Sequence, residues 1–168
     1  MSCSDYLHRM FDNEFYADAS TAFLRAGRHQ EAGICEAYLL QQEAQLISTS
    51  AGEVRAQAFV AAAKALSACA QGATPEWGNE RHILYTAAGE CYFKAGDLKR
   101  AGDTHLKAEG YDEAARAYRE GKHINEMVDV ITRHKDALNS SLLEELMMEA
   151  RMHYFKVYPS ILLVSKYF

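Results

Sequence analysis

Residues 85–123 decide the fold, because they read as three consecutive units of equal length: YTAAGECYFKAGD (85–97), LKRAGDTHLKAEG (98–110) and YDEAARAYREGKH (111–123). Each unit repeats a large side chain, a small one, a second large one and a second small one, at steps of three, four and three positions. These steps place the four positions on one face of an α-helix. Because repetition at a fixed period is typical of stacked repeat architectures, the stretch predicts an array of short helices.

The same pattern recurs elsewhere in the chain, with the last copy the loosest. Its four positions are Tyr16, Ala19, Phe23 and Ala26; Phe59, Ala62, Leu66 and Cys69; and Ile124, Met127, Ile131 and His134. The small residues allow a neighbouring helix to approach closely, and the large ones fill the space beside them. A helix inside such a unit holds about ten residues, or ~15 Å. Helices this short are marginal alone, so each must pack on its neighbours.

The composition favours helices as well. The 168 residues include 27 Ala, against 18 β-branched residues (6 Val, 6 Ile and 6 Thr). Alanine has the highest helix propensity, whereas strands favour β-branched side chains. We therefore expect an all-α fold without a sheet: a short right-handed α-solenoid of stacked antiparallel helices. Its single helical-repeat domain spans residues 1–158, and an apolar C-terminal tail follows at residues 159–168.

Glycines and capping residues predict the ends of the helices. Gly96, Gly110 and Gly121 lie near the ends of consecutive units, and we expect each of them at a helix C-terminus. Two Ser-x-x-Glu patterns, beginning at Ser50 and Ser141, are capping boxes. They predict that these two serines cap the N-termini of two further helices, the first of which is Ala-rich and runs to about Ala70.

Charge and hydropathy exclude several classes of function. The chain has 23 acidic and 18 basic residues, a formal net charge of −5, and no basic run. We therefore do not expect this chain alone to bind nucleic acid by neutralising phosphates. No apolar stretch reaches the ~20 residues of a membrane helix, so we expect no membrane partner. The N-terminal residues lack the basic start and apolar core of a signal peptide, which predicts an intracellular protein of the cytoplasm or nucleus.

The four cysteines Cys3, Cys35, Cys69 and Cys91 lie far apart in the sequence and form no Cys-x-x-Cys pair. We interpret them as reduced, mostly buried thiols. A zinc site and a disulfide framework are the alternatives.

The histidines form no catalytic or metal-binding motif. Glu145, Glu149 and His153 are spaced four positions apart on one helical face, and we interpret them as solvated charges rather than metal ligands. His105 occupies a position held by tyrosine in the adjacent units, so we expect a packed ring with a hydrogen-bonded nitrogen rather than a catalyst. We expect no catalytic residue, no metal and no cofactor, and hence no enzyme.

The ten tyrosines allow two interpretations, inter-helix packing and partner binding. Packing is favoured, because five of them lie on the repeated stripe: Tyr16, Tyr85, Tyr92, Tyr111 and Tyr118. Basic residues beside the stripe are better candidates for binding an acidic peptide. Helical geometry singles out four of them: Arg81, Lys99, Arg116 and Arg119.

The units resemble tetratricopeptide repeats, which are helix-turn-helix units with Gly at the turn and Ala in the stripe. The similarity lies in the junctions KAGDLKRA (94–101) and AEGYDEA (108–114). A pair of units such as 85–110 is shorter than the repeat of that family, which holds about 34 residues. The family's Trp-Leu-Gly and late Pro are also absent.

A second resemblance follows from the order of five segments: MFDNEFYADA (10–19), AYLLQQEA (37–44), FVAAA (59–63), AGECY (88–92) and ARMHYFK (150–156). Together they resemble the helical region that follows the UvrD-like helicase module in large fungal proteins and in TPR and ankyrin repeat-containing proteins. The resemblance implies a piece of a larger polypeptide. The chain has no Gly-x-x-x-x-Gly-Lys-Ser/Thr loop, so no ATPase residue is carried over.

Two functions from different classes remain. The preferred one is a non-catalytic protein–protein interaction scaffold, forming a portion of a larger protein and binding a protein or peptide partner. The alternative is an accessory helical segment of a UvrD-like helicase or another nucleic-acid-processing enzyme. The apolar C-terminal residues also leave a homodimer open.

Overall fold

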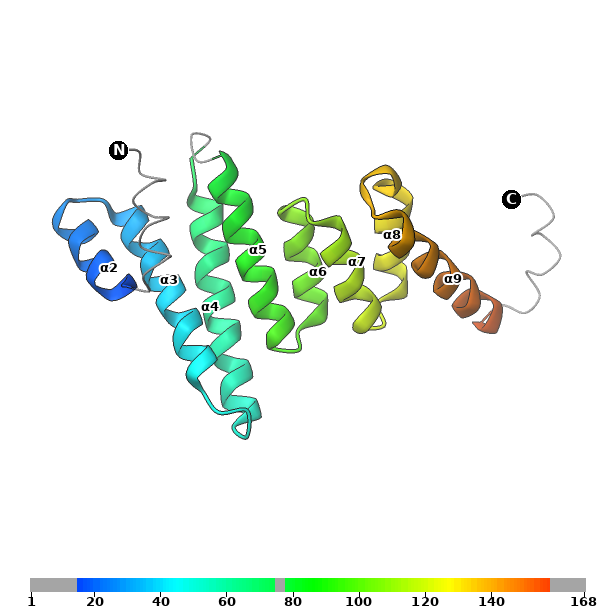
Figure 1. Ribbon diagram of the computed structural model, residues 1–168, viewed down its shortest axis with the longest axis horizontal. Coiled ribbons are helices and arrows are strands. Elements are labelled where there is room, and N and C mark those ends of the chain that lie inside the picture. Colours follow the sequence, from blue (N-terminus) through cyan, green and yellow to red (C-terminus); the bar gives the residue numbers. More distant parts are fainter. Residues whose placement is uncertain (1–14, 75–77, 158–168) are drawn as a thin grey trace.

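The computed structural model describes residues 15–74 and 78–157, and the structure is 83% helical with no strand in this part of the chain (Figure 1). The all-α fold class is therefore confirmed for these residues. The predicted tail at residues 159–168, and with it the homodimer contact, lies outside the described residues. The helices are α2 (Tyr16–Arg25), α3 (His29–Leu46), α4 (Gly52–Gly72), α5 (Gly78–Lys94), α6 (Leu98–Lys107), α7 (Tyr111–Glu120), α8 (Ile124–Arg133), the 3-10 helix η2 (Lys135–Ala137) and α9 (Ser140–Val157).

The helices lie in an elongated row, with α2 at one end and α9 at the other (Figure 1). The most extensive packing is between helices adjacent in the chain, and α9 also contacts α7. The core accordingly divides into two clusters. The first runs from α2 to α6 and includes Ala117 of α7, and the second runs from α7 to α9.

The repeated unit corresponds to one helix in only part of the chain. Helices α2, α6, α7 and α8 contain ten residues each, as the period of the repeat predicts. The ten-residue length is wrong for α5, which contains 17 residues, whereas the 21 residues of α4 match the longer helix to about Ala70 that follows from the Ser50 pattern. In both, the unit is preceded by further helix-compatible residues without an internal break, so the helix begins about two turns before the unit.

The second position of every unit is completely buried. This position is 0% exposed at Ala19, Ala62, Ala88, Ala101, Ala114 and Met127. Alanine at five of the six sites keeps the space between adjacent helices small, as the sequence pattern predicts. Four of the five stripe tyrosines are also buried, and the half-buried Tyr111 stacks on His134 with ring centroids 4.0 Å apart.

The short turns between helices share one geometry. In the turn after α5, the amide of Asp97 donates to the carbonyl of Tyr92 at 3.0 Å, and the turn after α6 repeats this bond from Gly110 to His105 at 2.9 Å. The turns after α2 and α7 carry the same bond. These are Schellman bonds, which satisfy carbonyls at a helix C-terminus.

The left-handed residue of these turns is not always glycine. Gly96 has φ +78° and confirms the expected C-terminal glycine, but the equivalent residues in the next two turns are Glu109 and Lys122, with φ of +56° and +58°. Gly121 is the C-cap residue of α7, as expected, whereas Gly110 is the N-cap residue of that helix, so the expectation for Gly110 is wrong. Gly121 also allows a close approach, because a Cβ there would lie 2.9 Å from the Cβ of Leu98.

Both capping-box predictions are wrong about the capping residue. Helix α4 begins at Gly52 with no side-chain cap, and the hydroxyl of Ser50 pairs with that of Ser48 at 2.8 Å. Helix α9 begins at Ser140, and its cap is Asn139, whose Oδ1 accepts from the amide of Ser141 at 3.0 Å. Asparagine is as good a cap as serine, so the helix starts slightly earlier than the box predicts.

Candidate functional site

A groove of about 830 Å³ lies between the exposed face of α4 and the turns that follow α5 and α7. We call it the α4 groove. Its first wall is formed by Glu53, Ala56, Gln57, Val60, Ala61 and Lys64 of α4. Its second wall is formed by Ala95, Gly96, Asp97, Leu98, Lys99, Gly121 and His123. Figure 1 shows its origin: the hairpin of α3 and α4 extends beyond the turns of the shorter helices, which leaves a step at this edge of the array.

The floor of the α4 groove is apolar and made mainly of small residues, and its rim carries both signs of charge. Two of the four rim charges are already paired within the chain: Asp97 contacts Arg100 at 2.6 Å, and Lys99 contacts Glu126 at 2.8 Å. Glu53 accepts a hydrogen bond from Gln57 at 2.8 Å. Lys64 is exposed and makes no ion pair with any residue the structure describes, so its ammonium is free to contact a partner.

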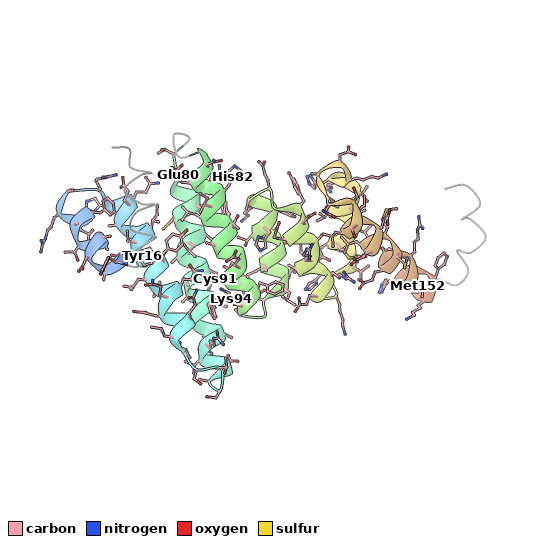
Figure 2. All side chains as sticks on the ribbon, viewed as in Figure 1. Tyr16, Glu80, His82, Cys91, Lys94 and Met152 are labelled. Atoms are coloured by element: carbon pink, nitrogen blue, oxygen red, sulfur yellow. The ribbon has the colours of Figure 1, made fainter. Side chains whose placement is uncertain are left out.

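The four basic residues singled out by the sequence do not form one patch. Only Lys99 lines the α4 groove. Arg81 lies near the start of α5, between Glu80 and His82, which Figure 2 labels. Its guanidinium carbon lies 5.7 Å from the centroid of the Tyr85 ring. Arg116 is exposed on α7 and forms no ion pair within residues 15–74 and 78–157.

The charges of Lys99 and Arg119 are used inside the molecule. The Lys99–Glu126 hydrogen bond joins α6 to α8, and it raises the pKa of the lysine and lowers the pKa of the glutamate. Arg119 donates to Glu145 at 3.0 Å and to Glu149 at 2.7 Å, which joins α7 to α9. The side chains of Glu145 and Glu149 remain 58% and 38% exposed, so both are solvated charges as interpreted from the sequence, with Arg119 as their ion-pair partner.

His105 is buried, as predicted, but its nitrogen is not satisfied as predicted. Its Nδ1 is enclosed and makes no hydrogen bond with the described residues. A Cβ added to Gly89 of α5 would lie 2.7 Å from the imidazole, so the ring occupies the space above this glycine. Burial lowers the pKa of His105, which keeps the imidazole neutral near pH 7.

The same arrangement recurs one unit later, where the ring of Tyr118 covers Gly102 and its hydroxyl donates to Asp103 at 2.6 Å. These two ring–glycine contacts are not among the features predicted from the sequence. The signal was present, because Gly89 and Gly102 occupy the same position in consecutive units, and each is followed in the next unit by its ring residue at the same offset. A glycine in the middle of a helix costs about 1 kcal/mol relative to alanine, so its recurrence in register indicates a packing role.

Three of the four cysteines lie among the described residues. Cys35 and Cys91 are buried and Cys69 is half-buried, Cys69 and Cys91 are free thiols, and Cys3 lies outside the described residues. Burial raises the pKa of Cys91 to about 11 and also raises the pKa of Cys69. Thiols with raised pKa values are weak nucleophiles near neutral pH.

Two other surfaces expose large apolar side chains. At the tip of the α3–α4 hairpin, Leu46 is 85% exposed and Val54 is 59% exposed. Along α9, Met148, Met152 and Phe155 lie on one exposed helical face, and Figure 2 shows Met152 near the far end of this helix.

The α4 groove is an open surface formed by the described residues. They contain no cluster of three or more His, Cys, Asp or Glu side chains placed to hold a metal. No helix among them has both the length and the apolar character needed to cross a membrane. No protein-family model matches the chain, and neither a curated protein nor a solved structure matches it.

Proposed function

We propose that the chain is a non-catalytic protein-interaction scaffold, built as a short right-handed α-solenoid similar to tetratricopeptide repeats and forming part of a larger protein. The observation that supports this proposal is the α4 groove. This open groove has a volume of about 830 Å³ and lies between one long helix and two turns. Packing of each helix mainly on its chain neighbours leaves such a surface accessible along the row.

The lining of the α4 groove suits an amphipathic helix or an extended peptide from a partner. Ala56, Ala61 and Gly96 leave space for a partner's apolar side chains to approach the backbone of the scaffold. Glu53 and Lys64 lie about three helical turns apart on α4 and carry opposite charges. A partner with the complementary order of charges would therefore be bound in one direction.

The chemistry of the described residues supports a non-catalytic role. The thiols of Cys69 and Cys91 have raised pKa values, and Nδ1 of His105 makes no hydrogen bond to a nucleophile that the imidazole could activate. Two of the four charged groups at the rim of the α4 groove, Asp97 and Lys99, are held in ion pairs within the chain.

Cross-linking pull-downs with a groove variant and a matched control test the proposal. Ala61 and Ala68 are both exposed alanines of α4, and only Ala61 lines the groove. We expect Ala61→Arg to lose the partner that the wild-type chain retains, at least tenfold, and Ala68→Arg to retain it. Cross-links from a partner should map to both walls of the groove.

Equal retention by the two variants, or no protein retained above background by the wild type, contradicts the proposal. Salt-sensitive binding of DNA or RNA by the purified chain would instead favour the accessory segment of a helicase. The intact transcript shows whether the chain belongs to a longer polypeptide.

A further inference from the structure

The side chain of His105 is the most unusual buried group in the described part of the chain. It is 4% exposed on α6 and its ring lies directly over Gly89 of α5. The equivalent ring residues on the flanking helices are Tyr92 and Tyr118, and the ordinary pKa of a tyrosine hydroxyl, about 10, lies far above neutral pH. At position 105 the same packing position holds a histidine, whose side chain is of a type that can gain a proton near neutral pH.

Helix α6 is also where the core divides. Ala101 belongs to the cluster that runs back to α2, whereas Leu106 packs against the cluster that runs on to α9. The α4 groove spans this division, because one wall belongs to α4 and the opposite wall includes Gly121 and His123 from the turn after α7. The packing of α6 on α5 therefore sets how the two parts of the array are placed.

Protonation of His105 would place a second N–H in a site with no acceptor. The charged groups that face the imidazole are Glu90 of α5 and Glu113 of α7, and both favour the protonated form. Neither makes a hydrogen bond to Nδ1, and the effect of burial exceeds theirs. A buried N–H without an acceptor is unfavourable, and a buried charge is more so.

We propose that His105 makes the joint between α5 and α6 acid-sensitive: protonation of the imidazole weakens its packing on Gly89 and loosens α6 and α7 from the N-terminal part of the array. This device acts on the fold itself and does not depend on the proposed partner. The state with neutral His105 is the closed one, and acidification opens the joint.

The direction of the pH effect follows from the pKa of His105. Because its pKa in the folded chain is lower than the ordinary value of about 6.5, the unfolded or opened chain binds more protons between these two values. The stability of the joint is complete above pH ~6.5 and is lost as the pH falls through the folded pKa. Each unit of difference raises the opening equilibrium constant up to about tenfold.

Hydrogen exchange at pH 7.5 and pH 5.0, corrected for intrinsic exchange rates, tests the proposal with two variants and a control. His105→Tyr introduces the residue found at the equivalent positions 92 and 118, and His105→Phe removes every titratable atom. In the wild type we expect protection of α6 and α7 to fall at pH 5.0 more than protection of α3 and α4. Both variants should lose this difference, and His29→Phe, which removes an exposed histidine, should keep it.

An NMR titration of the histidine side chains provides a second readout, in which His105 should titrate below the exposed histidines. Persistence of the acid-induced loss in both His105 variants would overturn the proposal, because the carboxylates would then be its source. Titration of His105 at or above the ordinary value would overturn it as well. If one variant fails to fold, the other variant and the titration still decide.

Discussion

The helices α3, α4 and α5 contain 18, 21 and 17 residues, whereas α6, α7 and α8 contain ten each. The long helices pack through many small residues, and Ala62, Ala63 and Ala70 of α4 are all completely buried. Among the short helices, α6 and α7 each place one ring over a glycine of the previous helix, whereas α8 buries Met127 and Val130. The difference in length produces the step that forms the α4 groove. We call the ten-residue helices α6, α7 and α8 the regular part of the array, and the groove lies where the longer helix α4 extends beyond the turns that follow α5 and α7.

The largest predicted effect tests whether the two clusters are separate structural units. Leu66 of α4 and Met127 of α8 are both 0% exposed, and replacing either with alanine should lower the free energy of unfolding by about 2–5 kcal/mol. Because packing is mainly between adjacent helices, hydrogen exchange should rise chiefly in α3–α5 for Leu66→Ala and in α7–α9 for Met127→Ala. Uniform loss of protection in both variants would show one cooperative unit instead.

The second prediction concerns the ring–glycine contacts of the short helices. Gly102→Ala adds a methyl group within 2.4 Å of the Tyr118 ring, which is buried and held by Asp103. We expect a loss of about 1–3 kcal/mol in urea unfolding, despite the better helix propensity of alanine. The matched control is Gly52→Ala in α4, where nothing lies within 4 Å and the stability should stay equal or rise. An equal response of the two variants would contradict a close-approach role for Gly102.

The regular helices are also where sequence reasoning works best. The repeated pattern correctly predicts three helices of equal length that begin at Leu98, Tyr111 and Ile124. A short turn follows each unit there, so the turn residues and the buried positions indicate the same helix boundaries. The same pattern fails to give the lengths of α4 and α5. No turn precedes their units, and the extra turns of helix are stabilised by neighbouring helices rather than by the pattern itself.

The candidate site is less predictable from sequence than the fold. Helical geometry within single helices singles out four basic residues, Arg81, Lys99, Arg116 and Arg119. It does not indicate that Arg119 pairs with glutamates 26 and 30 residues away. The α4 groove depends on helix lengths and on turns distant in sequence, such as Gly96 and Gly121. Both features are tertiary, which is why neither a motif nor a period indicates them.

The third prediction uses the shared turn geometry to stabilise the regular part. Glu109 and Lys122 hold left-handed conformations that disfavour a Cβ, so Glu109→Gly and Lys122→Gly should each raise the free energy of unfolding by about 0.5–1 kcal/mol. The reverse change, Gly96→Ala at the equivalent position, should lower it by about 1 kcal/mol. Thermal and urea unfolding measure both signs. A destabilising effect of glycine at both sites would mean that their side chains matter more than their backbone conformation.

The smallest predicted effect concerns the join between the last short helix pair and α9. Arg119 links α7 to Glu145 and Glu149, and its side chain is 39% exposed, so solvent screens both ion pairs. Arg119→Gln should lower the free energy of unfolding by about 0.2–1 kcal/mol at low salt, and by less in 1 M NaCl. Arg116→Gln is the control on the same helix, because Arg116 makes no ion pair with the described residues and should respond little at either salt concentration. A salt-independent loss in Arg119→Gln would assign its role to packing of the side-chain stem along α9 rather than to charge.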